Sequence, residues 1–516
     1  MLELAHAQSE SWRPGMRKPL VLHPFLYAAE PVLALFAQNA GIVAVHELGV
    51  CLAVTCALAA AAWFVASRLV RDSLTGAAVA SWMVLLLFSF GRLLAMVGVQ
   101  SARFSRATWF SLWLILLLLG LALVARLRSR SRQVNVWLNV LAIGWSLLPL
   151  LQVTLDLATR LAVSRTFQPV SAPSSASVWQ GPVPDIYYII LDGYARNDVL
   201  KAIYDYDNQA FLDRLTQKGF FVATSSRTNY SQTIPSLASS LNMTYLDDVA
   251  RQMSAAPHNR WPAVQMIHDS AVVRFLKQRG YQFVAVASAY SGTEFQSADV
   301  CAQPPASLTY FQNMLLGATP LVTLFPNLQY DIHRDRILFS FRFLQEFQPG
   351  EAPVFLLAHI VSPHPPFVFE EDGSSLYPLR PFSLIDGSHY LRSSAREEYR
   401  QGYIRQLLHV SQLIEETVDI ILASSQEPPV IILQADHGPG SMLDWENVDN
   451  TNLQERLSIL NAYYLPQGKQ TLYDTISPVN TFRVVLNACL GTHLVLLPDT
   501  SHFSTASHPY EFVACP

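Results

Sequence analysis

The chain has 516 residues, of which 51% are hydrophobic and 14% are charged, and its formal net charge is −4. Because charged residues make up about 25% of an ordinary soluble protein, this composition indicates a membrane protein. The small negative charge and the lack of a separate basic face argue against polyanion binding, so we expect no nucleic-acid partner.

Five apolar segments lie in the first third of the chain, near residues 19–38, 45–67, 75–98, 107–125 and 135–157. Each approaches the roughly 20 residues that a helix needs to cross the hydrocarbon of a bilayer, so we predict a helical membrane domain with about five spans. The first segment contains His23, Glu30 and prolines, and an interfacial or re-entrant segment is the alternative there.

The basic residues beside these segments predict their orientation. Nine of them flank the side that includes the N-terminus: Arg13, Arg17, Lys18, Arg68, Arg71, Arg126, Arg128, Arg130 and Arg132. The loops on the other side contain only Arg103 and Arg106. Since positive charge favours the cytoplasmic side, we expect an internal N-terminus and an external C-terminal domain.

The remainder of the chain divides into a linker and a large outer domain. Residues 164–183 are rich in Ser and Pro without apolar periodicity, which is typical of a linker, although an ordered arm is the alternative. We therefore predict a membrane domain at 1–163, a linker at 164–183 and an outer domain at 184–516. The outer domain contains Cys301, Cys489 and Cys515, and their spacing leaves both a disulfide and free thiols open.

The outer domain begins with a continuous apolar run, "IYYIIL" at 186–191, which is typical of a strand buried on both faces. Similar runs occur at 283–288, 354–361 and 430–434, and helical patterns occur between them, for example at 208–220. Strands that alternate with helices predict an α/β domain with a mostly parallel central sheet.

Polar residues follow two of these runs directly. Asp192 comes after the first strand, and Asp436 with His437 comes shortly after the last. Because ligands of such sheets bind beyond the carboxyl ends of the strands, we expect the three side chains on one rim. An isolated Asp192 could equally start a turn or cap a helix. Clustered carboxylates are costly without a cation between them, so the set favours a divalent metal site.

Thr233 is the candidate nucleophile. It precedes Pro235 and the sequence "SLASSLNM", which predicts a helix whose N-terminal N–H groups could hold an anion. A divalent cation lowers the pKa of a bound hydroxyl and makes it reactive at neutral pH. The alternative is a threonine that only caps the helix.

Three motifs, "YYIILDGY", "SQTIPSLAS" and "IILQADHG", occur in this order and together resemble the alkaline phosphatase/sulfatase superfamily. With the apolar segments in front, the chain looks most like the membrane-anchored branch that contains lipoteichoic acid synthases, phosphoglycerol transferases and phosphoethanolamine transferases. The resemblance implies that Thr233 becomes phosphorylated. It also implies that Asp192, Thr233, Asp436 and His437 bind one divalent ion, which would be manganese, zinc or magnesium.

His364 lies between prolines after the strand at 354–361, at a position that resembles the family histidine acting on the substrate phosphate or leaving group. An imidazole suits this role because it exchanges a proton near neutral pH, although a structural histidine in a proline-rich turn is the alternative. We expect His359, inside the strand, to be a core residue. His493, His502 and His508 are the remaining candidates for a second metal site, but they occur in unremarkable sequence.

One departure from the sulfatase pattern narrows the range of functions that the resemblance implies. Formylglycine-dependent sulfatases need Cys or Ser in a C/S-x-P-x-R motif, whereas this chain has Thr233 at the first position and Leu237 at the last. We therefore expect a single-metal phosphotransferase that moves a phosphoglycerol or phosphoethanolamine headgroup from a phospholipid donor to an envelope glycan or lipid acceptor. The alternatives are a phosphodiesterase or sulfatase-like hydrolase with the same site, and a non-catalytic membrane-anchored binding protein. The resemblance implies a multi-pass protein of the bacterial inner membrane whose outer domain is periplasmic or extracellular.

Overall fold

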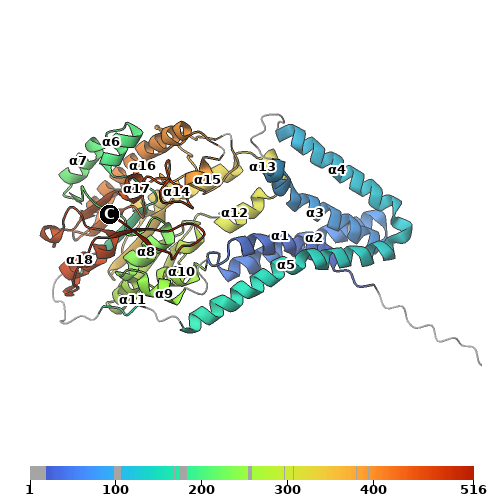
Figure 1. Ribbon diagram of the computed structural model, residues 1–516, viewed down its shortest axis with the longest axis horizontal. Coiled ribbons are helices and arrows are strands. Elements are labelled where there is room, and N and C mark those ends of the chain that lie inside the picture. Colours follow the sequence, from blue (N-terminus) through green and yellow to red (C-terminus); the bar gives the residue numbers. More distant parts are fainter. Residues whose placement is uncertain are drawn as a thin grey trace, which may run out of the picture.

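The computed structural model describes residues 19–97, 106–166, 170–173, 183–253, 259–295, 297–305, 307–378, 380–392 and 394–516. Figure 1 shows a bundle of long helices beside an α/β domain. The bundle consists of α1 (His23–Gln38), α2 (Val45–Val70), α3 (Ser73–Val97), α4 (Arg106–Arg126) and α5 (Ser131–Thr166). Most of the predicted linker at 164–183 lies outside the described residues, and its first residues belong to α5.

Four of the described helices are long and apolar enough to cross a membrane: residues 45–70, 73–92, 108–126 and 128–164. The fifth predicted segment also forms a helix, but α1 has only 16 residues, and at 1.5 Å per residue it extends roughly 24 Å. It is the centre of the bundle, because Ala28, Val32 and Phe36 are fully buried against the other helices. In contrast, α4 and α5 expose leucines such as Leu119 and Leu148, as lipid-facing helices do.

The outer domain is built on a seven-stranded sheet with the order β2-β7-β6-β1-β5-β3-β4. Its strands are β1 (Ile186–Leu191), β2 (Phe221–Val222), β3 (Gln282–Val286), β4 (Val300–Ala302), β5 (Val354–Ile360), β6 (Val430–Gln434) and β7 (Asn461–Tyr464). The five strands from β6 to β4 are parallel, whereas β7 and β2 complete one edge in antiparallel fashion. A separate antiparallel pair consists of β8 (Ser501–Phe503) and β9 (Val513–Cys515). The predicted α/β fold with a mostly parallel sheet is confirmed.

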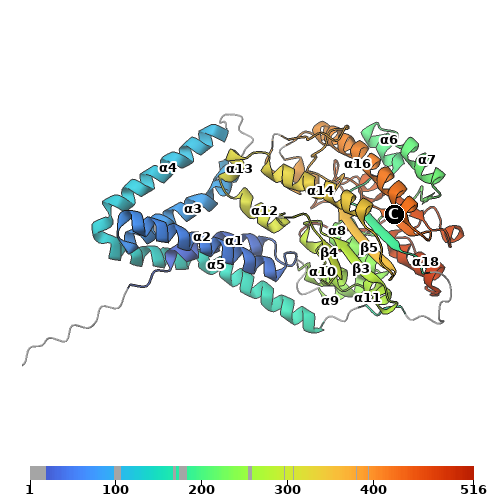
Figure 2. The same cartoon turned by 180° about the vertical axis from the view of Figure 1, so that it is seen from behind.

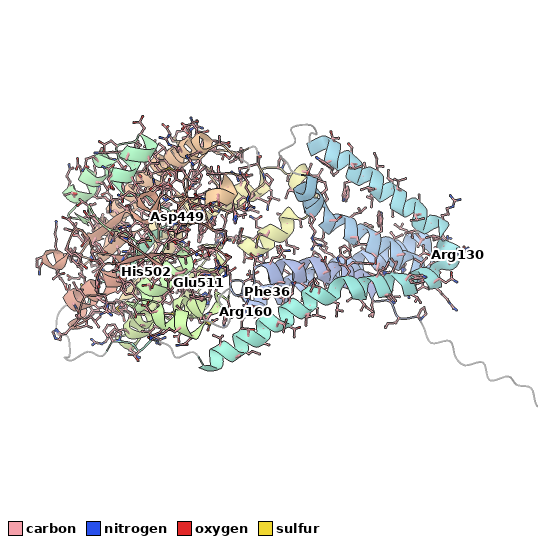
Figure 3. The ribbon with its side chains drawn as sticks, in the orientation of Figure 1. Phe36, Arg130, Arg160, Asp449, His502 and Glu511 are labelled. Atoms are coloured by element: carbon pink, nitrogen blue, oxygen red, sulfur yellow. The ribbon has the colours of Figure 1, made fainter. Side chains whose placement is uncertain are left out.

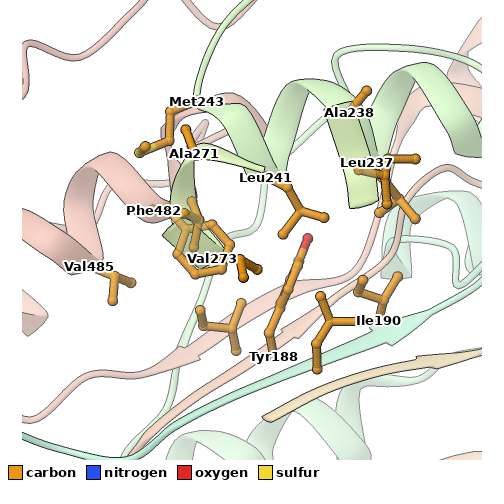
Figure 4. Close-up of a cluster of buried hydrophobic side chains, with 14 of the residues drawn as sticks. Tyr188, Ile190, Leu237, Ala238, Leu241, Met243, Ala271, Val273, Phe482 and Val485 are labelled. Atoms are coloured by element: carbon orange, nitrogen blue, oxygen red, sulfur yellow. The ribbon is translucent and has the colours of Figure 1, made fainter. Parts of the chain in front are cut away.

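Alternate residues of β1 face two different cores, which is why the strand is apolar throughout. Tyr188 and Ile190 belong to the first core, which Figure 4 shows between the sheet and the helices α8 (Thr233–Asn242) and α18 (Pro478–Leu490). The helices α9 (Asp247–Gln252), α10 (Trp261–His268) and α11 (Ala271–Gln278) lie on the same side.

The second core lies on the opposite face of the sheet and contains Tyr187 and Ile189 of β1. It is covered by the helices α6 (Asn197–Tyr204), α7 (Gln209–Gln217), α14 (Leu328–Glu346) and α16 (Arg396–Ser424). Burial on both faces fixes β1 in the middle of the sheet. The residue that follows β1 is therefore held rigidly at the sheet's rim. Two further short helices, α15 (Gly387–Tyr390) and α17 (Leu453–Leu457), lie in the loops near this rim.

The outer domain is fastened to the bundle through α12 (Tyr310–Gly317), which lies between the two parts with α13 (Leu321–Leu324) (Figures 1 and 2). The ring of Phe311 packs edge-on against Phe36 of α1, with the centroids 6.2 Å apart. Thr309 and Gln312 both donate hydrogen bonds to the buried carboxylate of Glu47 in α2, at 2.9 and 3.1 Å. The two parts thus share a packed and hydrogen-bonded interface.

Candidate active site

The site begins at the carboxyl end of β1, where the chain turns away from the sheet at Asp192. The backbone N–H of Asp192 donates to the carbonyl oxygen of Ile360 at the end of β5, at 3.0 Å. Gly193 then adopts a φ of +76°, a conformation that residues with a side chain rarely adopt. This turn leaves the Asp192 carboxylate buried at the rim between β1 and β5.

Asp436 and His437 follow β6, the other neighbour of β1, and reach the same rim. The main-chain oxygen of Asp436 accepts hydrogen bonds from the hydroxyls of Thr228 and Ser236, at 2.5 and 2.7 Å. Gly438 closes the turn against the backbone of Glu455, where a Cβ atom would lie only 2.0 Å from the carbonyl oxygen. Only glycine fits there without displacement of the chain, so the turn holds the preceding His437 in place.

The three residues fit a divalent metal ion. Asp192, Asp436 and His437 are buried, and one ligand atom from each lies within 4.8 Å of the others. Oδ1 of Asp192 and Oδ2 of Asp436 are buried without a hydrogen-bond partner, which is costly for carboxylate oxygens unless a cation binds them. Nδ1 of His437 faces the carbonyl oxygen of Gly438 at 3.0 Å and therefore donates to it. The lone pair of the neutral ring is then on Nε2, directed at the carboxylates.

Thr233 lies beside this cluster. It is the first residue of α8, and its hydroxyl oxygen is 3.0 Å from Nε2 of His437. The N-cap position belongs to Gln232, and neither side chain caps the helix. The helix-cap alternative for Thr233 is therefore not what the structure shows. The hydroxyl instead lies between the positive end of a helix and the buried carboxylates, where an anionic phosphate could be held.

His364 lies on the other side of Asp192. Its backbone N–H donates to the carbonyl oxygen of Asp192 at 3.0 Å, and its Nδ1 donates to the carbonyl oxygen of Pro365 at 2.6 Å. These bonds fix the ring with Nε2 3.9 Å from Oδ2 of Asp386. The ring centroids of His364 and His437 are 6.2 Å apart. The imidazole thus lines the same cavity as Thr233.

A buried ion pair lies next to His364, at positions that the sequence does not predict. Asp386 and Arg456 are both almost completely buried, and Nη1 of Arg456 donates to Oδ2 of Asp386 at 3.0 Å. The hydroxyl of Tyr399 donates to the other carboxylate oxygen at 2.8 Å. No local pattern signals these residues, because both lie in loops or short helices outside the strand ends.

His359 is buried in β5, as expected, but it is more than a core residue. Its Nε2 lies 3.3 Å from Oδ2 of Asp192, and its Nδ1 is 2.9 Å from the hydroxyl of Thr293. The alternation of side chains along the strands predicts this contact. His359 pairs in register with Ile190, and Asp192 is two residues after Ile190, so both side chains are on the same face of the sheet. His359 therefore holds the Asp192 carboxylate from the side of the sheet.

The electrostatic surroundings favour an ionised Asp192 and a neutral His437. Burial raises the pKa of Asp192, but chiefly His364 and His359 outweigh this effect and bring the pKa well below its usual range. Burial, together with the nearby Arg456, lowers the pKa of His437 below its ordinary value of 6.5. An ionised carboxylate and a neutral imidazole are the forms that bind a metal ion.

These residues line a cavity of about 370 Å³. Its polar wall contains Asp192, Thr233, His364, Asp386, His437 and Arg456, and its further lining includes Ile42, Arg260, Ile385, His389 and Trp445. Among the described residues that line it, none is His493, His502 or His508. His502 instead stacks on Tyr230 with the ring centroids 5.4 Å apart, and Figure 3 shows it in the outer domain. All five cysteines are free thiols.

An α/β domain with a mostly parallel sheet, a threonine at a helix N-terminus and two strand-end carboxylates is the arrangement expected of a sulfatase-like enzyme. The model of the Sulfatase family matches residues 184–480, more than half of the chain. The chain belongs to this family, as the three motifs indicated, and it is a sulfatase-like enzyme. No curated protein matches the chain.

Several solved structures are similar to it. Lipooligosaccharide phosphoethanolamine transferase A from Neisseria meningitidis, an integral membrane protein, is 14% identical with a TM-score of 0.40; the match covers 91% of this chain and 95% of that one. The C-terminal periplasmic domain of EcEptC from Escherichia coli is 13% identical with a TM-score of 0.42, covering 67% and 96%. The corresponding domain of phosphoethanolamine transferase EptC from Campylobacter jejuni is 11% identical with a TM-score of 0.36, covering 61% and 92%.

Proposed function

We propose that the protein is a membrane-bound phosphotransferase that moves a phospho-headgroup, of phosphoglycerol or phosphoethanolamine type, from a lipid donor to an envelope glycan or lipid acceptor. The observation that carries the proposal is the position of the Thr233 hydroxyl. It lies 3.0 Å from Nε2 of His437, at the start of a helix and beside two orphaned carboxylate oxygens. Ile42, from the loop between α1 and α2, lines the same cavity, so the helical bundle adds apolar surface to the site, which suits a lipid substrate.

In the first step, Thr233 is the nucleophile. A divalent cation held by Asp192, Asp436, His437 and Thr233 would lower the pKa of the threonine hydroxyl and neutralise charge on the phosphate. Thr233 gives its proton to solvent and reacts as the alkoxide: its oxygen forms a bond to phosphorus while the bond from phosphorus to the lipid oxygen breaks. His364 protonates the departing lipid alcohol, and the headgroup remains on Thr233 as a phosphodiester.

In the second step, the acceptor hydroxyl attacks the same phosphorus atom and gives its proton to His364, while the bond to the Thr233 oxygen breaks. His364 is suited to both steps because Nδ1 is engaged by Pro365 and only Nε2 is available for proton exchange. Oδ2 of Asp386 lies 3.9 Å from this nitrogen.

The family resemblance implies that the metal is manganese, zinc or magnesium, and carboxylates with one imidazole and one hydroxyl are compatible with all three. We further propose that this is a bacterial inner-membrane protein with its outer domain on the periplasmic or extracellular side. The bias of basic residues beside the apolar helices supports that orientation. We also propose the domain boundaries predicted from the sequence: a membrane domain at residues 1–163, a linker at 164–183 and an outer domain at 184–516.

The test is mass spectrometry of the full chain in lipid nanodiscs that contain manganese and bacterial phospholipids. We expect an adduct with the mass of one headgroup phosphate on the peptide that contains Thr233, and its mass identifies the donor. T233A should give no adduct, whereas T233S, which keeps a hydroxyl, should retain part of it. Headgroup released to water without transfer would indicate the hydrolase alternative. A metal-loaded protein with neither adduct nor release would indicate a binding protein and would refute the proposal.

A further inference from the structure

Arg260 is a cation of the cavity for which the proposed mechanism has no role. It precedes α10 and lines the cavity together with Thr233. Its Nη2 donates to the carbonyl oxygen of Ala506 at 2.6 Å and lies 3.4 Å from Oε1 of Gln232. Both acceptors are neutral. Within the described part of the chain, no carboxylate lies within ion-pair distance of the Arg260 guanidinium.

This sets Arg260 apart from the other arginine of the cavity. Arg456 is matched by Asp386 at 3.0 Å, so its charge is balanced inside the protein. Glu446 acts on Arg260 only from beyond ion-pair distance. A partly buried guanidinium without a carboxylate in direct contact is costly, and an anionic ligand that enters the cavity would offset this cost. The planar guanidinium also matches two oxygens of a phosphate, which makes arginine a common residue in phosphate recognition.

The membrane part of the chain holds Arg260 in place. Gly41 packs so closely that a Cβ atom there would lie 3.0 Å from the backbone nitrogen of Arg260, and its φ is +79°. Arg160 of α5 donates to the carbonyl oxygen of Val43 at 2.8 Å and stacks over the ring of Trp261, 4.6 Å from its centroid. Figure 3 shows Arg160 and Phe36 where the bundle meets the outer domain.

The surroundings of Arg260 combine this charge with apolar surface. Ile42 comes from the loop between α1 and α2 and also packs against the core of the outer domain. Leu384, Ile385 and Trp445 line the same cavity. A ligand that fits this lining carries an anionic group next to an apolar part. A lipid phosphate has this chemistry, and it would arrive from the side on which residues 41–43 lie.

We propose that Arg260 is the residue that binds the phosphate of the lipid substrate, in a cavity whose wall includes Ile42 from the loop between α1 and α2. This inference rests on the proposed function only for the statement that the lipid is a substrate. It assigns a specificity role to Arg260 and makes Ile42 part of the binding site. The outer domain alone would lack that wall.

The test measures binding without turnover. The full chain in detergent with T233A as background is titrated with a short-chain phosphatidylglycerol below its micelle concentration, and affinity is measured by microscale thermophoresis. We expect T233A/R260Q to bind about tenfold to a hundredfold more weakly, and T233A/R260K to be intermediate. The matched control is T233A/R251Q, because Arg251 is an exposed arginine paired with Asp248 outside the cavity. It should bind as T233A does.

Two further ligands identify what Arg260 recognises. Diacylglycerol with the same chains should bind equally to all variants, because it lacks the phosphate. If Arg260 recognises the anion alone, T233A/R260Q should also bind inorganic phosphate more weakly than T233A does. If only phospholipid binding is weakened, Arg260 contacts the phosphate as it is attached to the lipid. Either result supports the inference. Equal phospholipid affinity of T233A and T233A/R260Q would overturn it, as would a deficit of both Arg260 variants that accompanies a lowered unfolding temperature.

The binding test of Arg260 can fail or succeed independently of the test of the proposed function. If Thr233 is never modified but phospholipid binding depends on Arg260, the transferase proposal fails and the binding role of Arg260 stands. If Thr233 carries a headgroup adduct and R260Q binds phospholipid normally, the transferase proposal stands and the role of Arg260 is wrong.

Discussion

At the residue scale, the site contains two buried charged side chains of opposite sign that compensate each other. Asp386 and Arg456 are buried as a pair, and removal of one charge leaves the other unpaired in the interior. We expect D386N to lower the free energy of unfolding of the outer domain by about 3–5 kcal/mol, the usual effect of breaking a buried ion pair. Chemical denaturation followed by tryptophan fluorescence measures this change. D449N, at an exposed aspartate that Figure 3 labels, is the control and should change it by less than about 0.5 kcal/mol. A D386N variant as stable as this control would show that the pair contributes little.

The pKa of His437 predicts how metal binding depends on pH. Burial, with Arg456 nearby, lowers this pKa below 6.5, so the folded protein keeps the ring neutral at neutral pH. A proton and a metal ion compete for the same nitrogen. We therefore expect metal content, measured by elemental analysis after dialysis, to be constant above pH 6.5 and to fall only at lower pH. The metal-free protein should lose stability in the same direction, because below pH 6.5 the unfolded chain binds the proton more readily. Loss of metal with a midpoint above pH 6.5 would contradict the neutral assignment.

At the scale of single elements, the turn after β6 decides whether the site forms. A Cβ atom on Gly438 would lie 2.0 Å from the backbone oxygen of Glu455, so G438A must displace one of the two chains. We expect a loss of about 1–3 kcal/mol in the free energy of unfolding, together with reduced metal content because His437 moves. G350A is the control, since a Cβ atom there has nothing within 4 Å. Normal metal content in G438A would mean that the turn tolerates the displacement.

At the scale of the whole molecule, the interface between the helical bundle and the outer domain holds the two parts together. Glu47 of α2 accepts hydrogen bonds from Thr309 and Gln312 at the start of α12. Hydrogen bonds to charged groups contribute roughly 1.5–3 kcal/mol each, so E47A should loosen α12 from the bundle. Hydrogen exchange of residues 309–317 in the full chain should become faster, while the strands of the sheet stay protected. V50A, at an exposed apolar position of the same helix, should leave this exchange unchanged. Unchanged exchange in E47A would show that apolar packing alone holds the interface.

The sequence predicted the elements with strong local patterns. The apolar run at 186–191 became β1 with the same bounds, and the strand at 354–361 differs from β5 by one residue. Asp192, Asp436 and His437 could be placed on one rim because the carboxyl ends of neighbouring parallel strands always meet at one edge. The five apolar segments all became helices, but length and composition single out four as membrane spans. The short α1 owes its central position to packing, which its composition does not reveal.

Asp386, Arg456 and Arg260 could not be predicted in the same way. They lie in loops and at helix ends, where residues have no periodicity, and their roles arise from contacts with residues far away in the chain. Arg456 bonds Asp386 across 70 positions, and Arg260 meets Gly41 of the membrane loop. His359 was assigned to the core correctly, but its contact with Asp192 depends on the register of β1 and β5.

The sequence by itself determined the two-part architecture and the parallel sheet, because these follow from hydrophobic patterns, and it predicted Asp192, Asp436 and His437 as candidate metal ligands because they follow strand ends. The tertiary structure alone decided which buried charges have an oppositely charged partner in contact and which do not. It pairs Asp386 with Arg456, leaves Arg260 without a carboxylate partner among the described residues, and brings a membrane loop into the wall of the cavity. The physical reason is that a local pattern reports on a residue's own element, whereas burial and electrostatic compensation depend on every element packed around it.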